Sequence, residues 1–116
     1  PSSLIIVSRS LNSSPFLYMN AHCYILYSNT LKRFYTGACQ GDLQDRINRH
    51  NNHSYGKHRF TSTASDWELF IAIELKDYAR AVRLERHIKS MKSSKFIRNL
   101  KKYPEMVEKV IKEAST

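Results

Sequence analysis

The chain has 116 residues, 41% of them hydrophobic and 25% charged, and its 19 Lys and Arg outweigh 10 Asp and Glu to give a formal charge of +9. This length and composition predict one compact domain and exclude collagen-like, low-complexity and disordered chains, while the lack of an apolar run of roughly 20 residues excludes a membrane-spanning protein. The positive charge favours a polyanionic partner, above all nucleic acid, over an anionic membrane.

Residues 1–18 differ in composition and hydrophobic pattern from the rest of the chain. They are rich in Ser and show no sustained hydrophobic period, and they lack the basic leading segment and the long apolar core of a secretory signal. We expect these residues to be an appendage that is dispensable for a functional domain beginning at Met19.

Two strands are predicted next, at residues 23–27 and 33–38, because both segments are rich in β-branched and aromatic residues. The polar residues 28–32 between them suit a hairpin connection. The chain then breaks at Asp42, a residue suited to cap a helix. Apolar residues four positions apart predict this helix over residues 43–50.

The helix over residues 43–50 places Arg46 and His50 on one face, because they are four residues apart. Residues 51–65, which follow it, have no period and few apolar residues, so they are predicted to form a loop of the length usually kept for function.

A third strand is predicted at residues 67–75, where alternation places Trp67, Leu69, Ile71 and Ile73 on one face. An amphipathic helix follows, because apolar residues recur at helical spacing after a second capping residue, Asp77. Two shorter helices are predicted beyond it, and Pro104 suits the first turn of the last one.

The elements follow the order β-β-α-β-α-α-α, so the predicted fold class is α+β: a small three-stranded antiparallel β-sheet flanked by helices. Residues 19–102 are expected to form the functional domain, and residues 103–116 a C-terminal helix packed on it.

The positive charge is concentrated between residues 76 and 102, which hold ten Lys and Arg and only two acids, Asp77 and Glu85. A solvated helix face explains such charges as well as a binding surface does. Glu85 is more informative, because it lies at the edge of the apolar stripe, where a carboxylate meets the sheet. A structural pairing with Lys or Arg and a ligand to a divalent metal are both compatible with that place.

Tyr24 and Tyr35 fall on the two strands of the predicted hairpin. Taken separately, each fits an amphipathic core residue better than a catalyst, and Arg46 and His50 fit a surface pair. If these groups converge with Glu85, they can instead cleave a phosphodiester: the guanidinium neutralises the phosphate, a metal polarises it, and a hydroxyl or imidazole takes a proton from water.

The constellation resembles the GIY-YIG nuclease family, in particular its small stand-alone members and the N-terminal domain of excision-repair nucleases. The resemblance covers residues 22–100, and its specificity lies in the ordered set of motifs. His22-Cys23-Tyr24 and Tyr35-Thr36-Gly37 correspond to the two tripeptides of the family, residues 42–51 to its Arg-bearing helix, and residues 81–89 to its Glu-bearing helix. Both motif tyrosines are kept, although the first tripeptide is not Gly-Ile-Tyr and Thr36 replaces Ile.

The resemblance implies a metal-dependent endonuclease and a role for each matched residue. Tyr24 and Tyr35 would be the motif tyrosines, one of which helps to activate or orient the attacking water. Arg46 would hold the scissile phosphate, and His50 would assist proton transfer or orient Tyr24. Glu85 would ligate a single Mg²⁺ or Mn²⁺.

The resemblance also implies that Gly37 permits close approach of backbone or phosphate. The chemistry of tyrosine and arginine is consistent with these roles. A tyrosine with an ordinary pKa of about 10 is a poor base at neutral pH and needs help from its surroundings, and the forked donors of an arginine match two phosphate oxygens.

The preferred interpretation is a divalent-metal-dependent DNA endonuclease, structure-directed or weakly sequence-specific, with no small-molecule cofactor. The alternative is a non-catalytic nucleic-acid-binding module with a degenerate nuclease fold. Three questions stay open: whether RNA is accepted, whether a homodimer or a partner protein is involved, and whether the role is DNA repair, recombination or defence. Six basic residues are the candidates for nucleic-acid binding: Lys57, Arg59, Arg83, Arg86, Lys89 and Lys92. For Lys57 and Arg59, a solvated turn is the simpler interpretation.

Cys23 and Cys39 are too few for a disulfide scaffold, and they predict a reducing, cytoplasmic setting. With the remaining histidines they raise a zinc hypothesis. Zinc is disfavoured because the chain has neither a Cys-x2-Cys nor a His-x3-His pair. Both cysteines are expected to be small buried hydrophobes.

Overall fold

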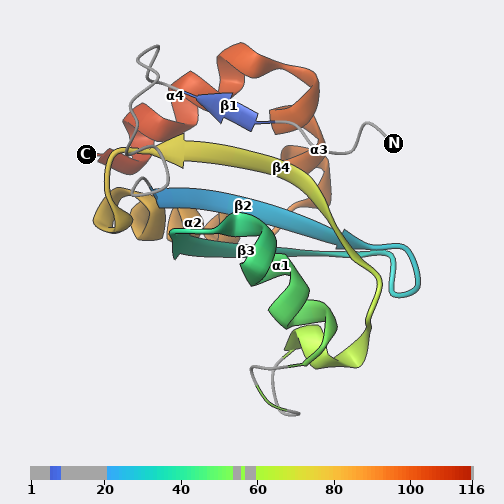
Figure 1. The fold of residues 1–116 in the computed structure, drawn as a ribbon. Helices are drawn as coiled ribbons and strands as arrows, with labels where there is room; N and C mark the ends of the chain where they lie inside the picture. The colour runs from blue at the N-terminus through green and yellow to red at the C-terminus, as the bar shows by residue number, and fades with distance from the viewer. Residues whose placement is uncertain (1–5, 9–20, 54–55, 57–59, 116) are drawn as a thin grey trace.

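Three long strands form the centre of the computed structural model, which describes residues 6–8, 21–53, 56 and 60–115. They are β2 (Ala21–Ser28), β3 (Arg33–Gln40) and β4 (Trp67–Leu75). β2 lies between the other two and pairs antiparallel with both (Figure 1). The predicted three-stranded antiparallel sheet is therefore confirmed, with β2 and β3 slightly longer than predicted.

A short fourth strand, β1 (Ile6–Ser8), extends this sheet. It pairs in parallel with β4, and Val7 lies opposite Ile73. The strand order is β1-β4-β2-β3, so β3 is at one end of the described sheet. β1 was not predicted. It falls within residues 1–18, whose dispensability stays a prediction.

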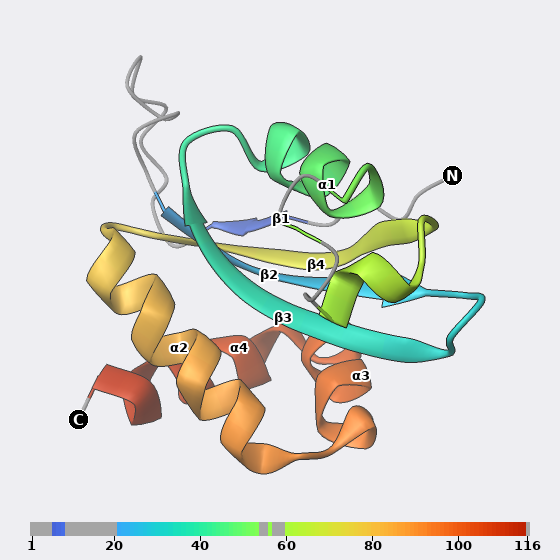
Figure 2. The same cartoon turned by 90° about the horizontal axis from the view of Figure 1, so that it is seen from below.

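Helices cover both faces of the sheet, as Figure 2 shows. α1 (Leu43–Asn51) lies on one face, and α2 (Tyr78–Met91), α3 (Ser94–Lys102) and α4 (Pro104–Ser115) lie on the other. These four helices were all predicted. A short 3₁₀ helix, η2 (Phe60–Thr63), interrupts the segment that was predicted to be a loop throughout.

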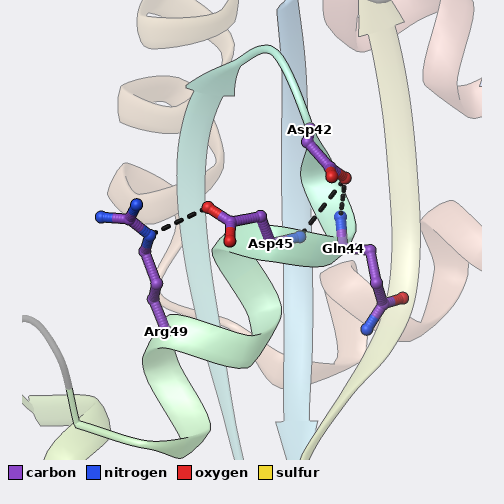
Figure 3. Close-up of polar contacts among 4 residues, drawn as sticks. All are labelled: Asp42, Gln44, Asp45 and Arg49. Carbon is purple, nitrogen blue, oxygen red and sulfur yellow. Dashed lines mark hydrogen bonds and ion pairs between the residues drawn. The ribbon is translucent and has the colours of Figure 1, made fainter.

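The predicted capping residues begin α1 and α2. Asp42 accepts hydrogen bonds from the backbone N–H groups of Gln44 and Asp45, at 2.9 and 3.3 Å (Figure 3). Each bond satisfies a donor that has no partner within the helix. Asp45 in turn pairs with Arg49, one turn later, at 2.9 Å. Asp77 caps α2 through the backbone N–H of Arg80.

A β-bulge in β4 divides the apolar side chains of this strand between the two faces of the sheet. Leu69 and Ile71 pair with consecutive residues of β2, so Phe70 is the extra residue of the bulge. Trp67 and Leu69 therefore pack in the core beneath α1, whereas Ile71 and Ile73 pack in the core beneath α2, α3 and α4. The prediction that all four share one face is wrong, because alternation reverses at a bulge.

Each of the two cores contains one cysteine. Cys23 lies beneath α2 and Cys39 beneath α1, and both thiols are free and buried. Burial raises the pKa of both thiols and so lowers their reactivity. Within the described residues, no helix has both the length and the apolar character needed to cross a membrane.

Candidate active site

Tyr24 lies in a slot between two small residues of the neighbouring strands. Gly37 of β3 and Ala72 of β4 are its direct partners in the sheet. A Cβ atom at residue 37 would lie 2.6 Å from both Cζ and Oη of Tyr24, a separation that real structures essentially never show. Gly37 thus makes room for a side chain, the phenol of Tyr24, where the sequence had suggested room for backbone or phosphate.

The hydroxyl of Tyr24 meets the imidazole of His50 above this slot. The distance from Oη to Nε2 is 2.8 Å, which is a normal hydrogen bond. Tyr24 is 2% exposed and His50 4% exposed, so the bond is buried beneath α1. Which of the two groups donates depends on the tautomer of the imidazole. α1 therefore brings His50 to the tyrosine.

Tyr35 lies on the same face of the sheet, two residues before Gly37 along β3. Its ring centroid is 5.0 Å from that of His50 and 6.4 Å from that of Tyr24. The ring of Trp67 closes the cluster at 6.3 Å in an edge-on arrangement. Tyr35 is only partly buried, whereas Tyr24 and His50 are buried. The motif tyrosines and the histidine thus form one cluster in which Tyr35 faces solvent most.

Asn51 fixes the end of α1 beside this cluster. Its side-chain amide donates to the backbone carbonyl of Trp67 at 2.9 Å, and its side-chain oxygen accepts from the backbone N–H of Trp67 at 2.7 Å. The two bonds tie the residue next to His50 to the first residue of β4. No local pattern predicts this role for Asn51, because the pairing joins residues that are sixteen positions apart.

Arg46 lies one turn before His50 on α1 and is partly buried. Its positive charge acts on the thiol of Cys39 in β3, whose pKa burial raises and Arg46 lowers by a smaller amount. The guanidinium of Arg46 therefore lies within electrostatic range of Cys39 in β3. Arg49, in contrast, is exposed and pairs with Asp45 on the outer side of α1 (Figure 3).

α2 contributes a carboxylate and an ammonium group from the other face of the sheet. Oε2 of Glu85 lies 2.7 Å from Nζ of Lys89, and the side chain of Glu85 is 19% exposed. The same ammonium lies 5.6 Å from the ring centroid of Tyr35. Lys89 therefore links Glu85 to the aromatic cluster. Glu85 lies close enough to the sheet to add to the raised pKa of Cys23.

A magnesium-type ion suits the oxygen chemistry of Glu85. Mg²⁺ commonly takes one or two carboxylates from the protein and keeps water and substrate phosphate as its other ligands. Glu85 offers one partly exposed carboxylate of this kind. Within the part of the chain that the structure describes, no group of three or more His, Cys, Asp or Glu residues is placed to hold a metal. An ion held by Glu85 would therefore take other ligands from water and substrate.

The predicted basic residues fall into three groups. Arg83, Arg86 and Lys92 are exposed on and just after α2. Lys89 is exposed too, but it pairs with Glu85. The remaining two candidates, Lys57 and Arg59, lie outside the described residues.

A family model described as the GIY-YIG catalytic domain matches residues 20–102. This stretch includes Tyr24, Tyr35, Arg46, His50 and Glu85. No curated protein and no solved structure matches the chain.

Proposed function

We propose that this chain, a member of the GIY-YIG nuclease family, is a divalent-metal-dependent DNA endonuclease, structure-directed or weakly sequence-specific. One observation carries the proposal. Tyr24, Tyr35 and His50 form a single aromatic cluster, and the Glu85–Lys89 pair reaches it from α2. Residues from two strands and two helices thus bring a hydroxyl, an imidazole, an ammonium and a carboxylate to one region, as phosphodiester hydrolysis requires.

Tyr35 is the tyrosine that we assign to the attacking water. It is partly exposed, whereas the hydroxyl of Tyr24 is covered. A phenol is a poor proton acceptor at neutral pH unless neighbouring groups stabilise its charged form. The ammonium of Lys89 near the Tyr35 ring provides positive charge for that purpose.

Tyr24 and His50 act together beneath Tyr35. Their hydrogen bond holds the imidazole in one orientation against the Tyr35 ring. An imidazole held in this way can orient the hydroxyl of a neighbouring residue such as Tyr35 and share the proton of that hydroxyl. Catalytic bases are commonly supported by a second group in this manner. We therefore assign a positioning role to Tyr24 and a supporting role in proton transfer to His50.

Arg46 is assigned to the scissile phosphate. Its guanidinium remains charged at every accessible pH, and its forked donors can bind two phosphate oxygens at once. Charge that develops on the phosphate during hydrolysis is stabilised by such a preorganised cation. Arg46 lies on the same helix as His50, so α1 would deliver phosphate binding and proton transfer together.

Glu85 is the residue that would hold one Mg²⁺ or Mn²⁺. When bound, such an ion polarises the phosphate and favours ionisation of water. In the structure, Lys89 pairs with this carboxylate. In the active protein, its ammonium would therefore have to share the carboxylate with the ion or move away from it. The exposed Arg83, Arg86 and Lys92, on and just after α2, would bind the backbone of the DNA.

Cleavage of a panel of DNA structures tests the proposed function. Single-stranded, duplex, flapped, gapped and four-way DNA would be incubated with the protein and Mg²⁺, Mn²⁺ or EDTA. We expect cleavage with either metal ion and none with EDTA, and the relative rates would rank the substrates. Arg46→Ala, purified in the same way, should be inactive, whereas the matched variant Arg49→Ala on the outer side of α1 should cleave like the parent.

Two outcomes would contradict the proposal. Salt-dependent binding without cleavage of any DNA would favour the non-catalytic binding module. Cleavage by Arg46→Ala at the parental rate would show that the activity comes from elsewhere, either another site or a contaminating nuclease.

A further inference from the structure

We propose that the exposed side of α3 is a second nucleic-acid contact, which binds the phosphate backbone beyond the aromatic cluster. The identity of the ligand rests on the proposed function. The place of the contact rests on the charges of α3, on the aromatic rings that lie against three of them, and on the contrast with α4.

The first observation is uncompensated positive charge. α3 carries four cations in nine residues and no acid. On α2, Arg80 pairs with the capping residue Asp77, and Lys89 pairs with Glu85. Over the described ranges, in contrast, none of the α3 cations lies within ion-pair distance of a carboxylate; they are Lys95, Arg98, Lys101 and Lys102. A polyanion would therefore meet charges that no internal partner neutralises.

The second observation is that aromatic rings lie against three of these cations. Nζ of Lys102 lies 5.4 Å from the ring centroid of the adjacent Tyr103. The guanidinium of Arg98 lies 5.2 Å from the ring centroid of Phe34, and Nζ of Lys101 lies 4.6 Å from that of Phe70. Phe34 in turn packs edge-on against Phe70 and at a tilt against Tyr27, with centroids 4.9 Å apart in both pairs. Such cation–π contacts fix long side chains in place. Less side-chain entropy is then lost when a phosphate binds.

The third observation is the contrast between α3 and α4, which lie next to each other on the same face of the sheet (Figure 2). α4 carries both acids and bases, and its three glutamates, Glu105, Glu108 and Glu113, outnumber its two lysines. A polyanion would be repelled there. The positive charge on this face is therefore concentrated on α3 and the neighbouring part of α2. A group of cations of this kind suits a nucleic-acid backbone better than an acidic protein surface.

The position of α3 implies an extended contact. Tyr24 and His50 lie beneath α1 on one face of the sheet, whereas α3 packs on the opposite face. Nucleic acid that contacts both must pass the edge strand β3. The substrate would accordingly contact a larger part of the protein surface than the aromatic cluster alone.

Binding of a labelled duplex tests this inference. The probe would be a fluorescent duplex of about 20 base pairs, which at about 3.4 Å per pair exceeds the longest dimension of the molecule, 36 Å. EDTA would prevent cleavage. Lys95→Gln with Lys102→Gln would be compared with Lys109→Gln and Lys112→Gln on α4, so that each protein loses two exposed charges.

We expect the α3 double variant to bind about tenfold more weakly, and the slope of log K against log salt to decrease in magnitude by up to about 2. The α4 variant should bind like the parent. Equal losses in both variants would show a net-charge effect, and parental binding by the α3 variant would show no contact; either result overturns the inference.

A parallel cleavage assay of the parent separates this inference from the proposed function. Cleavage by the parent together with parental binding by the α3 variant would overturn the second contact alone. Weakened binding by the α3 variant, in a parent that cleaves nothing, would support the contact and contradict the nuclease proposal. If the parent does not bind the duplex at all, the inference is wrong.

Discussion

Oη of Tyr24 and Nε2 of His50 lie 2.8 Å apart in a buried part of the molecule, between β2 and α1. The slot that allows this contact is formed by Gly37 and Ala72, which leave space on both neighbouring strands. A hydrogen bond between two covered groups contributes more to orientation than a solvent-exposed one, because water cannot replace either partner.

Tyr24→Phe should therefore lower both stability and cleavage. Removing one partner of a buried hydrogen bond costs about 1–3 kcal/mol, and loss of a group that supports proton transfer lowers the rate by about 100-fold. Thermal unfolding and single-turnover cleavage measure the two effects. Tyr27→Phe on the same strand is the matched control, and equal effects of the two substitutions would contradict the role assigned to Tyr24. A positioning role further requires that the pH profile of the residual cleavage shifts, since His50 would lose its partner.

Gly37→Ala should disturb the same slot from the opposite strand. The added methyl group would meet the rigid ring of Tyr24 at 2.6 Å, and overpacking of this kind costs about 1–3 kcal/mol. We expect a lower melting temperature and weaker cleavage. In a Tyr24→Leu background the same substitution should cost much less, because Leu has neither Cζ nor Oη. An unchanged cost in that background would show that the clash is not with Tyr24.

Asn51→Ala should loosen the end of α1. The substitution removes both hydrogen bonds to the backbone of Trp67, so we expect a loss of about 1–3 kcal/mol in the free energy of unfolding. Chemical denaturation provides the measurement. Asn48→Ala, which removes only an exposed bond to Gln44, should cost a few tenths of a kcal/mol at most. Similar losses for the two variants would contradict a special role for Asn51.

His22 should make stability depend on pH. Burial lowers its pKa below the ordinary 6.5, against a smaller opposing effect of the Glu74 carboxylate, and its buried Nδ1 has no hydrogen-bond partner among the described residues. The unfolded chain therefore binds a proton at a higher pH than the folded protein does. The free energy of unfolding should decrease as the pH falls through about 6.5.

The matched variant for this effect is His22→Gln, which does not titrate. Thermal unfolding between pH 7.5 and pH 5 should show a smaller decrease in stability for the variant than for the parent. A parent and a variant with the same pH dependence would show that other groups cause it.

The local features of the fold were predictable from the sequence. Capping by Asp42 and Asp77 and the apolar spacing within each helix depend on residues a few positions apart, and these patterns gave the four helices and the three long strands. Membership of the GIY-YIG family was predictable as well, from the order of the two tripeptides and the two helices, and the family match confirms it over residues 20–102.

Features that depend on pairing between distant residues were not predictable. The bulge at Phe70 changes which face Trp67 and Leu69 occupy, and alternation within one strand carries no sign of it. The same reason applies to β1, to the bond between Asn51 and Trp67, and to the place of Lys89 between Glu85 and Tyr35. The clash that a side chain at residue 37 would make with Tyr24 follows from the register of β2 and β3.

The most direct test of the nuclease proposal is single-turnover cleavage by Glu85→Gln in Mg²⁺, at protein concentrations that saturate the DNA. This substitution keeps the shape of the side chain and removes its charge. Glu105→Gln, at an exposed glutamate of α4, is the control. We predict that Glu85→Gln binds DNA like the parent or more tightly and cleaves it at least about 100-fold more slowly, whereas Glu105→Gln cleaves normally. Cleavage by Glu85→Gln at the parental rate would contradict the proposed active site.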